Sequence, residues 1–124
     1  MDDAKKIRTR EEIPEEDKWA LEDLFPSDEA WEADLKVLDA AGDELSQFAG
    51  KLGESGKSLY QYLSRMEELD EKGGLLANYC MRKADEDTRV AKYQAMKGQF
   101  MNVVVSMGAK CSFETPEIMD ISDE

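Results

Sequence analysis

The chain has 124 residues, of which 29 are acidic and 16 basic, so its formal net charge is −13, and it contains no histidine. Without histidine, its own residues cannot supply a Ser-His-Asp triad, a Cys-His pair or an HExxH zinc motif. The acidic balance disfavours binding to nucleic acid phosphates or anionic lipids, because like charges repel. We therefore expect no nucleic acid and no membrane among its partners.

The length suits one domain, and a composition of 41% hydrophobic and 36% charged residues fits a folded chain rather than a disordered one. Cys80 and Cys111 are too few for a disulfide framework and show no CxxC spacing. We interpret both as small hydrophobic residues. The sequence has no apolar run typical of a signal peptide or a membrane span, which predicts a cytoplasmic location.

Residues 1–26 are predicted to form an irregular N-terminal arm that packs on a helical bundle. The segment is polar and is interrupted by Pro14 and Pro26, whereas Trp19 and Phe25 supply apolar groups that would attach it to the bundle. The arm also carries the basic patch of the chain, which consists of Lys5, Lys6, Arg8 and Arg10. We expect this patch to contact an acidic body, either in this domain or in missing sequence.

The first long helix is predicted to begin after Ser27, a good N-cap, with Asp28 and Glu29 in its first turn. Its apolar positions alternate in steps of four and three: Trp31, Leu35, Leu38, Gly42, Leu45, Ala49 and Leu52. This spacing places them on one side of a helix. Glycines then mark the end of the helix and a turn: Gly50, Gly53 and Gly56.

A second helix is predicted from Ser58, and the adjacent glycines Gly73 and Gly74 are predicted to break it, because two glycines are poor helix formers. A third helix would follow and end at Asp85-Glu86-Asp87. Asp87 or Thr88 would cap a fourth helix. Residues 100–105 are apolar nearly all round, which predicts that the fourth helix is central in the bundle or is covered by another domain.

These elements predict an all-α fold, an antiparallel bundle of about four helices over residues 27–113 that follows the arm. Thr115, Pro116 and Glu117 are typical of a helix start, with proline at the first helical position. Few residues follow them, so we expect residues 114–124 to be the truncated start of a further helix that leads to a missing part. This interpretation makes the chain a fragment.

The acidic clusters are candidates for metal or acid–base sites, but their spacing does not support either. Asp85 and Asp87 have the spacing that opens a calcium loop, but the required glycine and glutamate positions hold Val90 and Met96, which excludes an EF-hand. A capping cluster between helices is the better interpretation. The acidic runs at 11–17 and 67–71 are interpreted as solvated helix faces. We assign no catalytic, cofactor-binding or metal-binding residue to this chain.

Short segments along nearly the whole chain carry a family resemblance. They are RTREEIP at 8–14, WALEDLF at 19–25, SDEAW at 27–31 and GKL at 50–52, then Tyr79, DEDT at 85–88, Phe113 and PEI at 116–118. In this order they resemble the start of the oligoendopeptidase F family, which are thimet-oligopeptidase-like zinc metallopeptidases. The pair Gly73-Gly74 departs from the family pattern, in which this stretch favours a helix.

The resemblance implies a non-catalytic N-terminal helical domain that forms one wall of the substrate channel in a cytoplasmic, zinc-dependent oligoendopeptidase. In that family the HExxH helix lies far toward the C-terminus, so no catalytic residue carries over and zinc belongs to the parent enzyme. The implied partners are the remaining catalytic domain of the same polypeptide and the oligopeptide substrate. Whether this chain is itself an enzyme is left open.

A second hypothesis is a complete small acidic helical adaptor or a mimic of nucleic acid charge, supported by the net charge of −13. Such a protein should bind a basic partner with a steep dependence on salt. For a fragment, residues 100–105 and 118–121 would normally face other domains. We then expect self-association through the apolar surface that truncation exposes.

Overall fold

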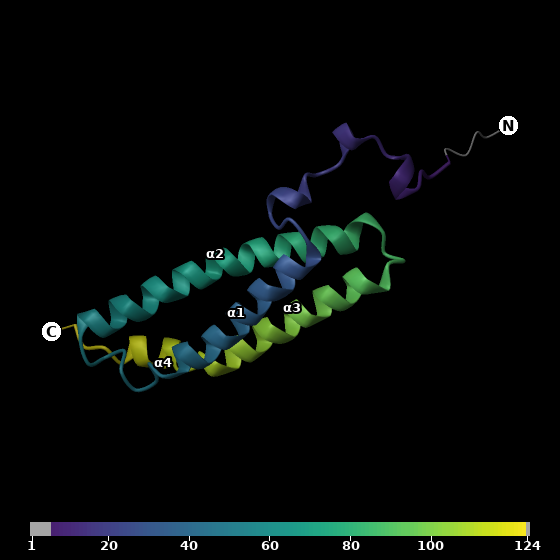
Figure 1. The fold of residues 1–124 in the computed structure, drawn as a ribbon. Helices are drawn as coiled ribbons and strands as arrows, with labels where there is room; N and C mark the ends of the chain where they lie inside the picture. The colour runs from purple at the N-terminus through teal and green to yellow at the C-terminus, as the bar shows by residue number, and fades with distance from the viewer. Residues whose placement is uncertain (1–5, 124) are drawn as a thin grey trace.

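The structure is a computed structural model, which describes residues 6–123 of the chain. Within this range the protein is helical and has no strand, so the all-α prediction is confirmed (Figure 1). Three short 3₁₀ turns come first, at Arg10–Glu12, Glu15–Asp17 and Leu21–Asp23. The helices that follow are α1 (Asp28–Ser46), α2 (Gly56–Glu86), α3 (Ala91–Lys110) and α4 (Glu114–Met119).

Helix α1 begins where the sequence predicts. The Ser27 side-chain oxygen accepts a hydrogen bond from the backbone N–H of Ala30 at 3.1 Å and so satisfies one unpaired donor of the first turn. The predicted apolar seam is buried as far as Leu45, but α1 ends at Ser46. Leu52, the last member of the predicted seam, is buried from the loop that leads to α2.

Helix α2 runs unbroken for 31 residues, so the predicted break at Gly73-Gly74 is wrong. The helix also starts earlier than predicted, after Ser55, whose side-chain oxygen accepts from the backbone N–H of Ser58 at 3.1 Å. The predicted second and third helices are therefore one element. The packed body contains three long helices rather than about four.

Packing explains why the two glycines do not interrupt α2. A glycine in a helix costs about 1 kcal/mol relative to alanine. Leu69 and Leu76 lie on either side of the pair and are both at least 98% buried, and burying a leucine side chain contributes about 1.5–3 kcal/mol. The local penalty at Gly73 and Gly74 is therefore outweighed by the core that the intact helix builds.

Replacing the adjacent glycines Gly73 and Gly74 in α2 is expected to stabilise the protein. A Cβ atom added at Gly73 or Gly74 meets no other atom within 4 Å. The double variant Gly73→Ala and Gly74→Ala should therefore gain about 2 kcal/mol in the free energy of unfolding, measured by urea titration. The contrasting variant is Gly50→Ala, because Gly50 has a φ of 80° and alanine there should cost about 1 kcal/mol. A loss of stability in the double variant would contradict the explanation given for α2.

Helix α3 is not central. It begins at Ala91, after Val90, so neither Asp87 nor Thr88 caps it. Only Met96 and Phe100 of this helix are fully buried. Val105, in the stretch that looked apolar all round, is 67% exposed. The predicted central position of this helix is therefore wrong. A helix segment with apolar residues on every side can still have one side exposed to solvent, so the pattern does not show how many elements surround the helix. Coverage by another domain stays a prediction.

Helices α1, α2 and α3 each pack against the other two, and their facing sides form one hydrophobic core. Helices α2 and α3 meet at a short connection and separate toward their other ends (Figure 1). Helix α4 lies at that wide end, near the loop between α1 and α2 (Figure 1). No helix within residues 6–123 combines the length and the apolar character that crossing a membrane requires.

Contacts with the rest of the protein hold α4 in place, since a helix of six residues is too short to be stable alone. The Glu117 carboxylate accepts hydrogen bonds from the backbone N–H groups of Gly50 at 2.8 Å and Leu52 at 3.2 Å. Tyr62 donates from its hydroxyl to the Glu114 carboxylate at 2.8 Å. Helix α4 begins one residue before the predicted Thr115, and proline is its third residue rather than its first.

The N-terminal segment is attached to the helices by its last residues. Leu21 and Phe25 are buried in the core, and the Phe25 ring meets the Tyr79 ring edge to face at 5.4 Å. Trp19, in contrast, is 63% exposed, with the Arg82 guanidinium 5.4 Å from its ring centre. Of the two residues expected to attach the segment, Phe25 is in the core and Trp19 is not.

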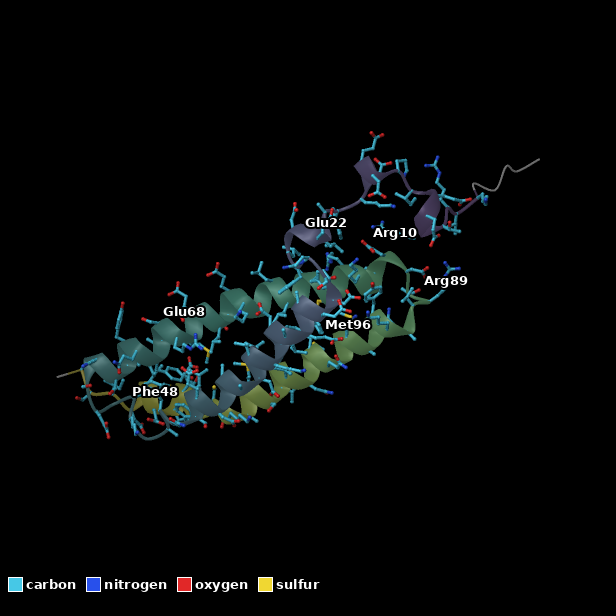
Figure 2. All side chains as sticks on the ribbon, viewed as in Figure 1. Arg10, Glu22, Phe48, Glu68, Arg89 and Met96 are labelled. Atoms are coloured by element: carbon cyan, nitrogen blue, oxygen red, sulfur yellow. The ribbon has the colours of Figure 1, made fainter. Side chains whose placement is uncertain are left out.

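The basic patch of the arm divides between two kinds of contact. Arg10 donates to the Glu86 carboxylate at 2.6 Å, and Figure 2 shows it beside the end of α2, as expected for contact with the acidic body. Lys6 instead pairs with Glu12 of its own segment at 2.9 Å. Lys5 lies outside the described residues.

Candidate functional site

The acidic cluster between α2 and α3 does not converge on a common point. Each of its three carboxylates pairs with a different arginine, as Asp85 with Arg82 at 3.7 Å, Glu86 with Arg10 at 2.6 Å and Asp87 with Arg89 at 2.7 Å. The hydrogen bonds from Arg89 lower the pKa of Asp87 to about 2. The cluster is a set of separate ion pairs at the end of α2. It lies between two helices, as expected, but it does not cap α3, whose N-cap is Val90.

A polar cluster that the sequence did not reveal joins the three long helices around Asp28. One carboxylate oxygen of Asp28 accepts from the Tyr79 hydroxyl of α2 at 2.7 Å. The other accepts from the Tyr93 hydroxyl at 3.3 Å and from the Lys92 ammonium at 2.6 Å, both on α3. The Asp28 side chain is only 13% exposed. Sequence reasoning assigned Asp28 to the first turn of α1 and had no signal for partners 51 and 65 residues away.

Electrostatics keep this cluster in one charge state. Burial alone would raise the pKa of Asp28, but the hydrogen bonds from Lys92 and Tyr79 outweigh burial and lower it. Burial and the hydrogen bond to Asp28 raise the pKa of Tyr79. The carboxylate therefore stays ionised and the tyrosine stays a hydrogen-bond donor around neutral pH. A group that keeps one protonation state near neutral pH is a poor acid or base. The hydrogen bonds of the cluster join the three long helices, which indicates a structural role.

The hydrophobic core is open to solvent in a groove of about 420 Å³ between α2 and α3. We call it the α2–α3 groove and define it by six of the residues that line it: Leu69, Asp70, Gly73, Phe100, Val104 and Gly108. Its lining is mainly apolar, with the Asp70 and Glu114 carboxylates as its acidic members. A concave apolar surface with few polar groups is a typical place for binding.

The two cysteines take no part in a reactive site. Cys80 is fully buried, and burial raises the pKa of its thiol to about 11. Cys111 is half-buried beside the α2–α3 groove, and burial raises the pKa of its thiol as well. Thiols with raised pKa values are weak nucleophiles at neutral pH. Both behave as the small hydrophobic residues that the sequence predicts.

No group of three or more Cys, Asp or Glu side chains within residues 6–123 is placed to hold a metal ion. The absence of a catalytic, cofactor-binding or metal-binding residue from this chain stays a prediction. Sequence reasoning missed the α2–α3 groove because the open space depends on how two distant helices separate.

Comparison with known proteins gives one consistent result. The chain is 32% identical over 121 residues to oligopeptidase PepF of Bacillus subtilis, which covers 98% of this chain and 18% of that protein. It is 31% identical over 114 residues to group B oligopeptidase PepB of Streptococcus agalactiae, covering 92% of this chain and 19% of PepB. It is 33% identical over 121 residues to the plasmid-encoded oligoendopeptidase F of Lactococcus lactis subsp. cremoris, and this alignment covers 94% of this chain and 20% of that protein.

The chain thus spans about a fifth of the length of the curated relatives it matches. No protein-family model matches it. No solved structure matches it either.

Proposed function

We propose, on the premise that nearly the whole chain is homologous to the oligoendopeptidase F family, that it is a non-catalytic helical domain of a zinc-dependent oligoendopeptidase. The observation that carries the proposal is the 32% identity to PepF over 98% of this chain. The same alignment covers only 18% of PepF, so most of the peptidase has no counterpart among these residues. The resemblance noted in the sequence assigns the domain to the N-terminal part of the parent enzyme.

The residues of this chain do not fit a zinc site. Histidine is absent from the sequence, and the thiols and carboxylates of the described residues form no group of three that could hold a metal. In the proposed enzyme, zinc binding and the activation of water therefore belong to the remaining polypeptide. The contribution of this chain is structural, as one wall of the channel that admits oligopeptides.

The architecture supports this division of roles. The Asp28 cluster and the fully buried Trp31 fix the three long helices relative to one another, which suits a rigid wall. Exposed apolar side chains on α3, such as Val105, offer surface for contact with the rest of the enzyme. We place the enzyme in the cytoplasm, together with its oligopeptide substrates.

The isolated chain is expected to hydrolyse no peptide, even with added zinc. The reason is that it lacks the histidine ligands of the HExxH motif. The measurement is hydrolysis of a fluorogenic oligopeptide, with PepF of Bacillus subtilis as the positive control. Turnover above a metal-free blank would contradict the proposed non-catalytic role.

The gene that encodes the chain gives an independent test. We expect the reading frame to continue beyond the codon for Glu124 and to encode an HExxH motif further on. An immediate stop codon in the natural gene would refute the proposal. It would favour the second candidate, a small acidic adaptor or charge mimic, for which the net charge of −13 is the supporting observation. A charge mimic would bind a basic partner with an affinity that falls steeply with salt.

A further inference from the structure

The exposed side of α3 carries no charge over most of its length. Residues 98–109 contain no acidic or basic side chain, although 36% of the whole chain is charged. Within this stretch Met101, Val104 and Val105 are 44%, 41% and 67% exposed. Val104 also lines the α2–α3 groove, so the apolar surface continues from the groove onto the outside of the helix. Such a continuous surface is a feature of interaction sites.

The opposite side of the groove is acidic. Asp70 lies at the groove on α2, and Glu67 and Glu71 are exposed within one turn of it. None of the three has an ion-pair partner within residues 6–123, whereas nearby Glu68 pairs with Arg65 at 2.9 Å. An occupant of the groove would therefore meet apolar side chains on α3 and uncompensated carboxylates on α2.

Two glycines make room between these sides. Gly73 of α2 and Gly108 of α3 both line the groove, and a Cβ atom added at either meets nothing within 4 Å. At these two positions neither helix places a side chain in the groove. A third helix laid between two helices buries its apolar stripe in such a groove, and residues three and four apart supply the contacts.

We propose that the α2–α3 groove binds a basic amphipathic helix. Its apolar stripe lies in the groove and along Val104 of α3, and its lysine or arginine side chains face Glu67 and Asp70 of α2. Charge selects this occupant over a second copy of the chain, because each copy carries a net charge of −13 and would repel the other. Binding of such a helix does not depend on the proposed peptidase function.

The test uses a synthetic amphipathic helix of leucine and lysine as the probe, titrated into the protein and followed by calorimetry. A second probe with glutamate in place of lysine should bind at least about tenfold more weakly, because it faces the carboxylates of α2. Equal affinity for the two probes would remove the electrostatic part of the proposal. Absence of binding by the lysine probe would overturn the proposal as a whole.

A matched pair of variants tests the location. Gly108→Leu fills the groove with a side chain, and Gly98→Leu places the same side chain on the same helix at a position that does not line the groove. Both replace an unhindered helical glycine, so both should fold and gain stability in a thermal scan. Binding of the lysine probe should fall about tenfold or more in Gly108→Leu and stay unchanged in Gly98→Leu. Equal binding by the two variants would place the probe elsewhere and refute the proposal.

A second pair isolates the carboxylates. Glu67→Lys with Asp70→Lys should weaken binding of the lysine probe about tenfold, because the charges facing the probe are reversed. Glu16→Lys with Asp17→Lys changes the net charge equally on the exposed N-terminal segment and should have a much smaller effect. Equal effects of the two double variants on binding would indicate that net charge alone attracts the probe, and would contradict specific binding in the α2–α3 groove. Sedimentation equilibrium completes the test, since a dimer that Gly108→Leu abolishes would identify a second copy as the occupant.

Discussion

Replacement of Trp31 by alanine is expected to lower the free energy of unfolding by about 3–5 kcal/mol. Trp31 is fully buried, and its indole N–H donates to the backbone carbonyl of Leu76 at 2.9 Å. The side chain thus fills the space between α1 and α2 and also satisfies a polar group in the core. A loss of this size is a large share of the total stability of a small domain, so the variant should unfold at a much lower urea concentration than the native protein.

The control for this prediction is the same substitution at the other tryptophan. Trp19 is 63% exposed, so Trp19→Ala should change stability by less than about 1 kcal/mol. Urea titration followed by far-ultraviolet circular dichroism measures both variants. The loss of stability in Trp31→Phe should lie between the losses in Trp31→Ala and Trp19→Ala, because phenylalanine keeps most of the apolar contact but loses the indole hydrogen bond. Similar losses at Trp31 and Trp19 would contradict the core described for α1 and α2.

Replacement of Asp28 by asparagine is expected to cost about 2 kcal/mol at neutral pH, because the side chain loses charge-assisted hydrogen bonds while keeping its shape. Asp28 is the carboxylate on which Tyr79 and Lys92 converge, and its side chain is 13% exposed. The variant weakens the link between all three long helices, because a neutral amide oxygen accepts these hydrogen bonds less strongly than a carboxylate does. As a comparison, Asp43→Asn removes a pair with Lys110 in which Asp43 is 76% exposed, and the cost should be below about 1 kcal/mol.

The pH dependence of the Asp28 effect has a definite sign. The pKa of Asp28 in the folded protein lies below the ordinary value of 3.8. The carboxylate therefore contributes its full stabilisation above that ordinary value and loses it as the pH falls through the lowered folded value. An asparagine at this position has no such titration, so the stability difference between the native protein and Asp28→Asn should shrink on acidification. A difference that stays constant from about pH 7 to about pH 2 would show that the charge of Asp28 is not what stabilises the fold.

Features that depend on neighbouring residues were predictable from the sequence. The start of α1 after Ser27 follows from the hydrogen bond that a serine side-chain oxygen can accept from the backbone N–H of its own helix, and the structure contains that bond. The buried face of α1 follows from residue spacing, as the burial of Trp31 and Leu38 shows. The contact of Arg10 with Glu86 is an exception, because it joins residues 76 positions apart and was still expected from opposite charge.

Features that depend on distant residues were not predictable. Gly73 and Gly74 looked like a break because their local cost is visible in the sequence, whereas the burial of Leu76 that offsets it depends on the fold. The apolar stretch of α3 gave no indication of which side faces solvent, and Val105 proved to be exposed. The Asp28 cluster and the α2–α3 groove arise only when residues from separate helices meet.

The burial of Leu21 and Phe25 determines where the cooperative unit of folding begins. These side chains lie before α1, yet they are as deeply placed as residues of the long helices, and Phe25 packs edge to face against Tyr79. Trimming the chain at residue 20 would remove no buried residue among residues 6–20, although it would remove the pair of Arg10 with Glu86 and the exposed ring of Trp19. Trimming it at Ser27 would leave the helices intact but uncover part of their core. A shortened or fused form of this protein should therefore begin before Leu21 and not at the first helix, because the folded unit includes Leu21 and Phe25.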